Sequence, residues 1–517
     1  MTRARDAATN SHVTTFVHPT GAGNNHIPTG GATDQVLTYA SAGTATWADA
    51  GGGGEQTFTA TGAISAGNPV GFNANGTVSA MPKMAGSAAA LGSGAFSTGG
   101  GRQPMAYDTA NDKYLHVFSG TNEKLFARVG TISNLGITFG TAVDSGTTLN
   151  VFARSRGELH LVYDDNAGKF VVSYCHSDGK GYARTITISG TTPSFGTEIN
   201  VYNGTTYHTE VAYDSNANKV LFLNAGNQDS IRGRVGTISG TNITLGSEAN
   251  LGGTAMYPVP GSLTFDSNVN KFVFVYGTSS AASPYKARTM TISGTSVSAG
   301  AEATLASSGH SNLVPYVVFD PSINKAVALF RENGFKFRLL TISGTSLTTG
   351  TTTTIPLTTT PVSGINGEVF SSCVDPDTGG IVLCYRTATD QTRITPAKFS
   401  GVNMTLSDEI VVSLNRKQNG IIYDPDADAT IVSTLDSAQV FKASSRPAYV
   451  SLAAESISNG ATGKVTIIGG VNANQSSLSA GSQYGIPVSS ASLVATDTDP
   501  VGIAISSTEI YLRAVSI

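Results

Sequence analysis

The stretch LHLVYDDNAGKFVVSYCHSDGKGYARTITISGTTPSFGTEINVY (159–202) decides the fold of this chain. Runs of β-favouring residues at 159–164, 170–174, 182–188 and 195–202 predict four strands. The turn-forming segments DNAGK, HSDGKG and SGTTPS separate these runs. Because each connection is short, we expect the strands to pair in sequence order as one antiparallel sheet.

The same pattern occurs seven times along the chain. In each unit an apolar run ends in Asp, and a short polar turn, usually with a Lys, follows. The seven residues are Asp108, Asp164, Asp214, Asp266, Asp320, Asp375 and Asp424. A repeat of about fifty residues in an all-strand sequence is typical of the blades of a β-propeller. We therefore predict an all-β protein with a seven-bladed β-propeller over residues 84–447.

Two turns within each unit have a physical explanation. The Asp after the first strand can accept hydrogen bonds from backbone N–H groups two or three residues later. The Gly of the recurring SGT turn supplies the positive φ of a tight hairpin. The seventh unit holds about three strands and stops near Arg446. We predict that ALGSGAFST (90–98), which is similar to the fourth-strand segments, completes the last blade and removes its open edge.

Composition excludes several classes of protein. The chain has 517 residues, of which 13% are charged, and a net charge of -4, so it has no basic footprint for nucleic acid. No apolar run is long enough to span a membrane, and the N-terminal sequence has no apolar core typical of a secretory signal. Three cysteines do not make a disulfide framework. Cys373 and Cys384 flank one turn, and we interpret them as small buried residues rather than as a bridge.

The flanks of the repeat region indicate an interrupted domain. Residues 55–83 and 448–517 contain strand and turn patterns without helical periodicity. We interpret them as one split, small β-sandwich-like or barrel-like domain that carries the propeller as an insertion, since propeller termini lie close together. Two separate small β-domains are the alternative. Residues 1–50 are polar and are expected to form an extended attachment segment that folds on a partner, and Gly51–Gly54 form a hinge.

Three stretches carry a resemblance to a known class of proteins. HIPTGGATDQVLTYASAGTATW (26–47) resembles a segment near the N-termini of bacteriophage tail-fibre and related virion appendage proteins. GAISAGNPVGFNANGTV and GKVTIIGGVNANQSSLSAGSQYGI resemble modules of phage fibre and virion surface proteins. The resemblance covers about the first eighty and the last seventy residues and assigns no family to the propeller. It implies an N-terminal segment attached to the virion, a homotrimeric shaft, and a distal domain that meets the host.

The candidate binding residues lie on one face of the expected propeller. The loops between second and third strands, and the segments before first strands, vary between the units, which suits recognition. Our hypothesis is glycan binding, with tyrosines stacking on sugar rings and polar side chains donating or accepting hydrogen bonds. The candidate receptor- or glycan-binding residues are Arg102, Arg154, Arg156, His160, Tyr207, His208, Tyr257, His310, Asn312 and Arg416, with Glu158, Glu210, Tyr316, Glu368 and Lys417 near them.

Other kinds of site were weighed against this one. A glycan hydrolase would use Arg102, Arg154 and Arg416 to bind a carboxylate sugar, and Glu158, Glu210 or Glu368 as acid or base. The repeats lack the sialidase motif SxDxGxxW, so no enzyme activity is expected. Calcium in the turns DTAND (108–112), DSNAN (214–218) and DPDAD (424–428) is the less favoured explanation of their Asp residues. His18, His26 and Trp47 are assigned to virion attachment, and no metal or other cofactor is predicted.

The sequence therefore predicts a virion appendage, most simply a phage tail fibre or tail-tip adhesin released by lysis. Its partners would be other copies of itself as a homotrimer, further virion proteins through residues 1–50, and a host surface glycan or protein. A head fibre or capsid decoration protein is the alternative, and a glycan hydrolase is the second alternative.

Overall fold

The computed structural model describes residues 35–41, 44–49, 54–73, 75–90, 104–133, 135–150, 159–206, 208–225, 230–254, 262–277, 284–307, 315–359, 370–389, 391–407, 409–412, 418–434, 437–442, 451–486, 491–496 and 500–513. The chain divides into two compact units, residues 1–82 with 447–517, and residues 83–446. Within the described ranges, no helix is long and apolar enough to cross a membrane.

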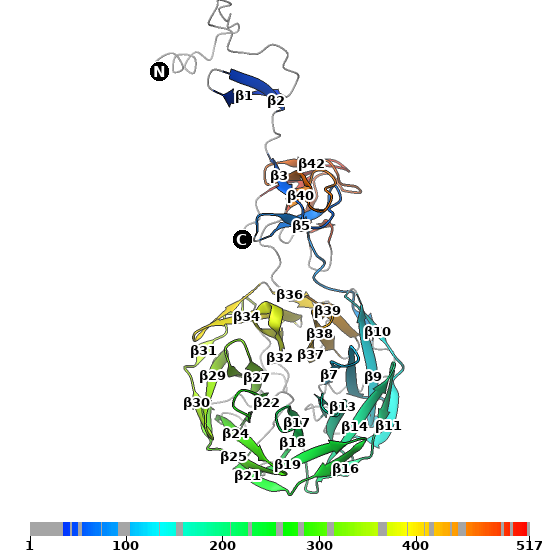
Figure 1. The fold of residues 1–517 in the computed structure, drawn as a ribbon, viewed down its shortest axis with the longest axis vertical. Helices are drawn as coiled ribbons and strands as arrows, with labels where there is room; N and C mark the ends of the chain where they lie inside the picture. The colour runs from blue at the N-terminus through cyan, green and yellow to red at the C-terminus, as the bar shows by residue number, and fades with distance from the viewer. Residues whose placement is uncertain are drawn as a thin grey trace, which may run out of the picture. The chain divides into compact units, whose positions relative to one another are not determined.

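The larger unit consists of antiparallel sheets arranged around a centre (Figure 1). We number these sheets 1 to 7 along the chain. Sheet 1 contains β7 (Met105–Asp108), β8 (Lys113–Ser119), β9 (Lys124–Ser133), β10 (Gly136–Phe139) and β11 (Val143–Thr148), with the short η1 (Thr121–Glu123). Sheet 2 contains β12 (Leu159–Asp164), β13 (Lys169–Cys175), β14 (Gly181–Ser189), β15 (Thr192–Phe195) and β16 (Ile199–Tyr202). Sheet 3 contains β17 (His208–Asp214), β18 (Lys219–Ala225), β19 (Ser230–Ser239), β20 (Asn242–Leu245) and β21 (Ala249–Thr254).

Sheets 4 to 7 follow the same strand order. Sheet 4 contains β22 (Leu263–Asp266), β23 (Lys271–Gly277), β24 (Tyr285–Ser293), β25 (Ser296–Ala299) and β26 (Ala303–Ala306). Sheet 5 contains β27 (Tyr316–Asp320), β28 (Lys325–Arg331), β29 (Phe335–Ser343), β30 (Ser346–Thr349) and β31 (Thr353–Thr354). Sheet 6 contains β32 (Phe370–Asp375), β33 (Gly380–Arg386), β34 (Thr392–Ser400), β35 (Asn403–Leu406) and β36 (Ile410–Val412), with η2 (Pro376–Thr378). Sheet 7 contains β37 (Gln418–Asp424), β38 (Ala429–Thr434), β39 (Ser437–Phe441) and the early strand β6 (Ala89–Ala90).

The first strands of the sheets form a closed ring. Each of β7, β12, β17, β22, β27, β32 and β37 contacts the first strand of the next sheet, and β37 contacts β7. The remaining strands of each sheet follow outward from the ring (Figure 1). This arrangement confirms the prediction of an all-β propeller.

The outer strand of each complete sheet differs from the expectation. FGTEINVY (195–202) was expected to be one strand, but β15 and β16 pair with opposite ends of β14 and leave a break between them. Gly196 lies in this break, and a Cβ there would come within 2.4 Å of the Thr241 carbonyl oxygen in the SGT turn of sheet 3. The break therefore makes room for the turn of the neighbouring sheet.

Sheet 7 is completed by a segment that precedes sheet 1. Ala89 and Ala90 pair with Ala438 and Ser437 of β39. The Gly86 N–H donates to the Val440 carbonyl at 2.8 Å, which extends the contact toward the N-terminal side. The ring is thus closed by an early strand, as expected, but the paired residues lie within 84–90. Most of ALGSGAFST (90–98), namely residues 91–98, lies outside the described residues.

The core of the larger unit lies between adjacent sheets. Phe272, Phe274 and Tyr276 of β23 pack against Leu221 and Leu223 of β18, and all five are at most 2% exposed. Burial of one such side chain contributes about 1.5–3 kcal/mol. Aromatic and branched residues from alternate positions of the second strand therefore hold neighbouring sheets together.

The smaller unit combines both flanks of the chain. Its first sheet has the order β3 (Glu55–Thr59), β41 (Thr462–Thr466), β40 (Ser451–Ala453), β4 (Pro69–Phe72) and β5 (Val78–Ala80). Ile64 and Ile457, in the segments AISAG and SISNG, exchange two backbone hydrogen bonds of 2.8 Å. Because strands from both flanks share one sheet, two separate β-domains are excluded.

The second sheet of the smaller unit comes from the C-terminal flank. It has the order β42 (Val471–Asn472), β46 (Ile510–Leu512), β45 (Gly502–Ala504), β43 (Gln483–Gly485) and β44 (Val494–Ala495). Leu452 of the first sheet packs with Tyr484, Ile510 and Leu512 of the second. The buried Asn472 amide donates to the Ala453 carbonyl at 2.9 Å and links the two sheets.

A hairpin occurs within the expected attachment segment. β1 (Gln35–Ser41) and β2 (Thr44–Asp49) pair antiparallel, with Leu37 opposite Trp47. The sequence reasoning treated residues 1–50 as extended and missed this hairpin. Alternation in QVLTYAS and TATWAD was the signal for it. His18 and His26 lie outside the described residues.

Candidate functional site

The Asp turns close by local hydrogen bonding, as the sequence predicted. Oδ1 of Asp214 accepts from the N–H groups of Asn216 and Ala217 at 3.0 and 2.8 Å. Asp424 makes the same contacts with Asp426 and Ala427, both at 3.0 Å. All seven repeat Asp residues are at most 4% exposed. A buried carboxylate that accepts two backbone N–H groups stabilises this turn without a metal.

Side chains at these turns also join neighbouring sheets. The Tyr163 hydroxyl donates to Oδ1 of Asp108 in sheet 1 at 2.6 Å. Tyr107 of sheet 1 likewise donates to Asp426 of sheet 7, so the link includes the point where the ring closes. Burial, and then the bond to the carboxylate, raise the pKa of both tyrosines well above the usual range. These hydroxyls therefore stay protonated and donate at every ordinary pH.

A repeated arginine makes a second connection between sheets. Arg184 donates through Nε to the Gly196 carbonyl at 2.9 Å and through Nη1 to the Ser145 carbonyl of sheet 1 at 2.9 Å. Arg234 and Arg288 repeat this pair of contacts in sheets 3 and 4. One planar guanidinium thus bridges the break in its own outer strand and the outer strand of the preceding sheet.

Three carboxylates gather where the ring closes. Oxygen atoms of Asp112, Asp424 and Asp426 lie within 4.8 Å of one another. Hard oxygen ligands of this kind suit calcium. Burial raises the pKa of Asp424, and the Tyr107 hydroxyl lies within hydrogen-bonding distance of both Asp112 and Asp426. Two of the turns considered for calcium are thus brought together, and the Tyr107 hydroxyl lies between their carboxylates.

The opposite ends of the first strands differ from sheet to sheet. The residue four positions before each repeat Asp occupies an equivalent place around the ring, and these residues are Pro104, His160, Glu210, Ser262, Tyr316, Ser371 and Gly420. They include an imidazole, a carboxylate and hydroxyls. This end of the ring therefore has no repeated chemistry, whereas the Asp-turn end has a uniform one.

Three consecutive sheets contribute to a buried polar cluster at this end, which we call the His–Glu–Ser cluster (His160, Glu210 and Ser262). His160 Nδ1 lies 2.7 Å from Glu210 Oε2. Glu210 Oε1 accepts a 3.0 Å hydrogen bond from the Ser262 N–H and a further one from the Ser262 hydroxyl. The three residues are 5%, 2% and 0% exposed. A buried carboxylate with this many donors is well satisfied.

The cluster fixes which nitrogen of its imidazole donates to Glu210. Glu210 can only accept when ionised, so His160 must donate from Nδ1. In the neutral ring Nε2 then carries the lone pair. Nε2 is buried and has no hydrogen-bond partner among the described residues. The arrangement presents one oriented nitrogen to which none of the described residues donates.

A structured loop lies at the same end of sheet 2. The Tyr182 hydroxyl donates to Oδ2 of Asp178 at 3.0 Å, and the His176 imidazole lies 3.0 Å from Oδ1. Burial raises the pKa of Asp178, but bonds from Lys180, His176 and Tyr182 outweigh it and the pKa is lowered. The loop HSDGKG (176–181) is therefore held in one shape by its own side chains.

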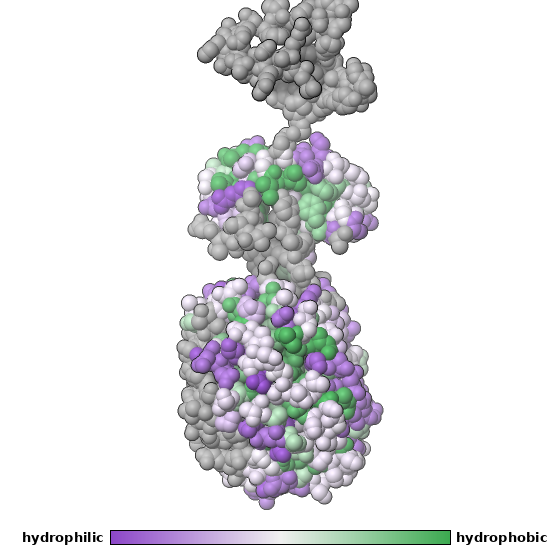
Figure 2. All heavy atoms as spheres, turned by 90° about the vertical axis from the view of Figure 1, so that its left-hand side faces the viewer, coloured by the Kyte–Doolittle hydropathy of each residue, from purple (hydrophilic) through white to green (hydrophobic). Residues whose placement is uncertain are grey.

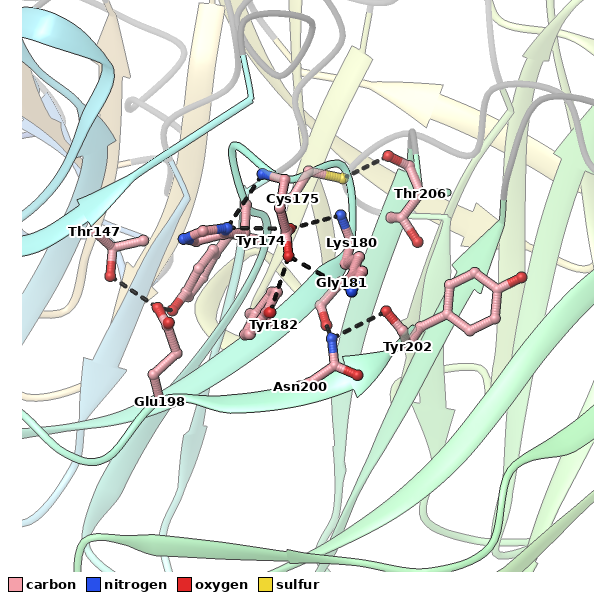
Figure 3. A network of polar contacts seen from close by, with 12 residues as sticks. Thr147, Tyr174, Cys175, Lys180, Gly181, Tyr182, Glu198, Asn200, Tyr202 and Thr206 are labelled. Carbon is pink, nitrogen blue, oxygen red and sulfur yellow. Dashed lines mark hydrogen bonds and ion pairs between the residues drawn. The ribbon is translucent and has the colours of Figure 1, made fainter. Parts of the chain in front are cut away.

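The strands around this loop are also cross-linked (Figure 3). Tyr174 and Thr147 both donate to Glu198, which joins sheets 1 and 2. The Cys175 thiol donates to the Thr206 carbonyl at 3.3 Å, which ties β13 to the segment that connects sheets 2 and 3. None of the three cysteines forms a disulfide, and Cys373 pairs with Val382 rather than with Cys384. The variable loop thus stands on a rigid support.

The structure places some of the sequence-derived candidates and not others. His160 and Glu210 are brought together, and His208 is buried at 2% exposure next along the same end. The Tyr316 hydroxyl donates to the Ser372 carbonyl at 2.7 Å and is used within the propeller. The remaining candidates lie outside the described residues: Arg102, Arg154, Arg156, Glu158, Tyr207, Tyr257, His310, Asn312, Glu368, Arg416 and Lys417.

The sequence reasoning missed Ser262. The residue lies in a Gly-Ser pair that looked like an ordinary loop. Its position four residues before the repeat Asp, as for His160 and Glu210, was the signal that could have revealed it. Aligning the seven units on their Asp residues is enough to place all three at one level of the ring.

Comparisons with known proteins assign no family to the chain. No family model and no curated protein matches the chain. A periplasmic gluconolactonase from Pseudomonas aeruginosa is 11% identical with a TM-score of 0.43, covering 69% of this chain and 96% of that one. The Cps50 (Swd1) β-propeller domain of Myceliophteria thermophila is 8% identical with a TM-score of 0.41, covering 69% and 99%. A chain of a mitotic checkpoint complex is 7% identical with a TM-score of 0.45, covering 70% and 92%.

Proposed function

We propose that this protein is a virion appendage, such as a phage tail fibre or tail-tip adhesin, whose propeller recognises a host surface. The observation that carries the proposal is the contrast between the two ends of the ring. Repeated Asp, Tyr and Arg side chains are used up in contacts within and between sheets. The varied side chains gather at the other end. A rigid ring with one variable face suits recognition.

The flanking sequences supply the virion part of the proposal. Residues 26–47 and two stretches of the smaller unit resemble modules of phage fibres and virion surface proteins. The smaller unit is built from both flanks, so it can carry the propeller as a displayed head. Several heads on one particle would gain avidity even where each binds weakly.

Self-association of the smaller unit is part of the proposal. One face of its second sheet is buried, while the opposite face carries Val471, Val494, Ile503, Ile505 and Tyr511. Four of these are at least 43% exposed, and apolar surface is visible on this unit in Figure 2. An exposed apolar patch of this kind supports an interaction site on this unit. Glu509 and Arg513 stand just before and just after β46, so a second copy can match opposite charges around an apolar centre.

Analytical ultracentrifugation tests the association. We expect the full chain to sediment as an oligomer, with three copies as the expected number, and Tyr511→Asp combined with Val471→Asp to reduce it to single chains. Val402→Asp, at a 57% exposed position of the propeller, should leave the oligomer intact. A single-chain mass for the unaltered protein contradicts this part of the proposal.

Recognition is tested on cells. Fluorescent full-length protein should label host cells, and Lys180→Glu in the variable loop should lower the labelling. Lys271→Glu, at the Asp-turn end, should leave it unchanged. Equal labelling by both variants contradicts the assignment of the recognition face.

Location on the particle separates the tail assignment from its alternative. A head fibre or capsid decoration protein would share the same modules. Negative-stain microscopy with an antibody against the propeller should label the tail, and label on the capsid supports the alternative instead.

Catalysis is a second candidate function, favoured by the oriented base in the His–Glu–Ser cluster. Incubation with host polysaccharide and measurement of chain length tests it. Loss of shortening in Glu158→Gln or Glu210→Gln supports a hydrolase, and unchanged chain length removes it.

A further inference from the structure

The His–Glu–Ser cluster is a chain of hydrogen bonds with one open end. Ser262 of sheet 4 donates to Glu210 of sheet 3, which in turn accepts from His160 of sheet 2. The chain stops at His160 Nε2, which is buried and has no partner among the described residues. A buried acceptor without a donor is unfavourable, and such atoms in native proteins usually meet a ligand or water.

Sheet 1, the other neighbour of sheet 2, offers His160 no donor at the position equivalent to Ser262. In sheet 4 the residue four positions before the Asp is Ser262, whose N–H and hydroxyl both serve Glu210. In sheet 1 the same position is Pro104, which has neither a backbone N–H nor a polar side chain. The residue that donates to Glu210 thus has no counterpart in sheet 1 that could donate to His160.

The charges of the cluster limit which kind of group can donate a hydrogen bond to His160 Nε2. An anionic group would meet the Glu210 carboxylate only one imidazole away, which is unfavourable. A cationic group would lose its hydration, while both Glu210 oxygens are already occupied by His160 and Ser262. A neutral hydroxyl has neither cost and is a good donor to a ring nitrogen.

We propose that His160 Nε2, aligned by Glu210 and Ser262, is a subsite for a neutral sugar hydroxyl at the first-strand end of the ring. This inference rests on the proposed recognition role of the propeller and specifies its ligand class. It departs from the arginine-based hypothesis of an acidic sugar, because the cluster selects for an uncharged donor. His160 acts as the contacting residue, and Glu210 and Ser262 are positioning residues.

Saturation-transfer NMR on the full chain tests the subsite. The probes are the methyl glycosides of glucose, galactose and mannose, with N-acetylneuraminic acid as the anionic comparison. At least one neutral glycoside should bind, and the acid should not. His160→Phe should weaken that binding about tenfold or more, as expected for loss of one buried hydrogen bond. Lys169→Gln, at the Asp-turn end of the same sheet, should leave it unchanged.

A second variant guards against misfolding of His160→Phe, which leaves Glu210 without its imidazole. Glu210→Gln keeps the shape and the bond from Ser262, but its amide donates to Nδ1 and moves the ring proton to Nε2. It should weaken sugar binding while thermal unfolding shows a folded protein. Two-bond ¹H–¹⁵N spectra should show Nε2 of His160 unprotonated in the unaltered chain and shifted on addition of sugar.

The outcomes separate this inference from the proposed function. Absence of binding by every neutral glycoside, equal binding by His160→Phe, or a proton on Nε2 each overturns the subsite. If the protein still labels cells after one of these results, the propeller recognises the host through a different ligand. Cell labelling that is absent while a glycoside binds overturns the recognition role and leaves the subsite.

Discussion

Single residues in this propeller have two kinds of role, and their partners distinguish them. Asp214 is bonded to backbone groups two and three residues away, so its role is set within one turn. His160 depends on Glu210 and Ser262, which lie in other sheets. His116 is a third case: it is fully buried in sheet 1, and neither ring nitrogen has a partner among the described residues.

Replacing Asp214 should show what one turn contributes. Asp214→Ala leaves two buried N–H groups without an acceptor, so we expect a loss of about 1–3 kcal/mol in the free energy of unfolding. Asp214→Asn keeps Oδ1 and should cost less. Urea denaturation followed by circular dichroism measures both. Equal stability of the alanine variant and the unaltered protein contradicts the assigned role.

Removing the imidazole of His116 should stabilise the protein, and more so in acid. Burial first, and the positive charge of Arg128 second, lower the pKa of His116 to about 3. The unfolded chain binds its proton near pH 6.5, so stability is present above that pH and falls as the pH drops toward 3. His116→Leu removes this loss, which amounts to about 2 kcal/mol at pH 5.

Thermal unfolding of His116→Leu and the unaltered chain at pH 8 and pH 5 measures the difference. The gain in melting temperature should be larger at pH 5. An equal gain in melting temperature at both pH values would contradict this prediction.

Among the strands, a tyrosine and a glutamate are paired in alternate sheets. Tyr174 and Tyr276 are the second-last residues of the second strands of sheets 2 and 4, and they donate to Glu198 and Glu302 at the break in the outer strand. Sheet 6 repeats this with Tyr385 and Glu409. Glu409 also accepts from the Thr359 hydroxyl at 2.8 Å, so the pair is tied to the segment that follows β31 of sheet 5. Sheet 3 has Asn224 at the tyrosine position.

The acid stability of sheet 6 should depend on Glu409. Burial raises the pKa of this carboxyl, but bonds from Tyr385, Thr358 and Thr359 outweigh it and hold the pKa at about 2. The folded pKa is below the unfolded one, so this contribution is present above about pH 4.3 and is lost as the pH falls toward 2. Glu409→Gln should lower stability at pH 7 and flatten the acid profile.

Stability between pH 7 and pH 2, from denaturant midpoints, tests this. Glu248→Gln is the control, because Glu248 is exposed and its ion pair with Arg232, at 3.8 Å, is a loose one. Identical acid profiles for Glu409→Gln and the unaltered protein would falsify the prediction.

At the scale of the whole molecule, the ring depends on a segment that is remote in sequence. Gly86, Ala89 and Ala90 pair with β39, and Tyr107 reaches Asp426 across the same junction. Without this segment β39 would present an open edge, which invites aggregation. Closure therefore ties the beginning of the propeller to its end and lets both flanks enter one small domain.

A single methyl group at Gly86 should loosen the junction. A Cβ there would lie 1.8 Å from the Leu135 carbonyl of sheet 1, so the strand has to shift. We expect Gly86→Ala to cost about 1–3 kcal/mol. Faster hydrogen exchange in β39 than in β18 should show where the ring opens. Ser87→Ala, an exposed neighbour, should change stability by about 0.5 kcal/mol at most.

The sequence predicted the repeat unit in detail but the outer strand less well. Residues 159–164 are a strand with the expected bounds, since alternation and turn residues act over a few neighbours. The break at Gly196 was missed because its cause, the carbonyl of Thr241, belongs to the next sheet. The closing strand was placed a few residues late for a similar reason: its partner β39 lies far along the chain.

What the sequence by itself determined is the set of local structures: short strands, Asp and SGT turns, and their count along the chain. These follow from hydrogen bonds and side-chain alternation over distances of two to five residues. Only the tertiary structure decided which of the variable residues meet. His160, Glu210 and Ser262 come from three sheets, and they touch because closure of the ring sets the inner strands in one register. The turn acids are explained by their own neighbours, whereas the candidate site exists only between sheets.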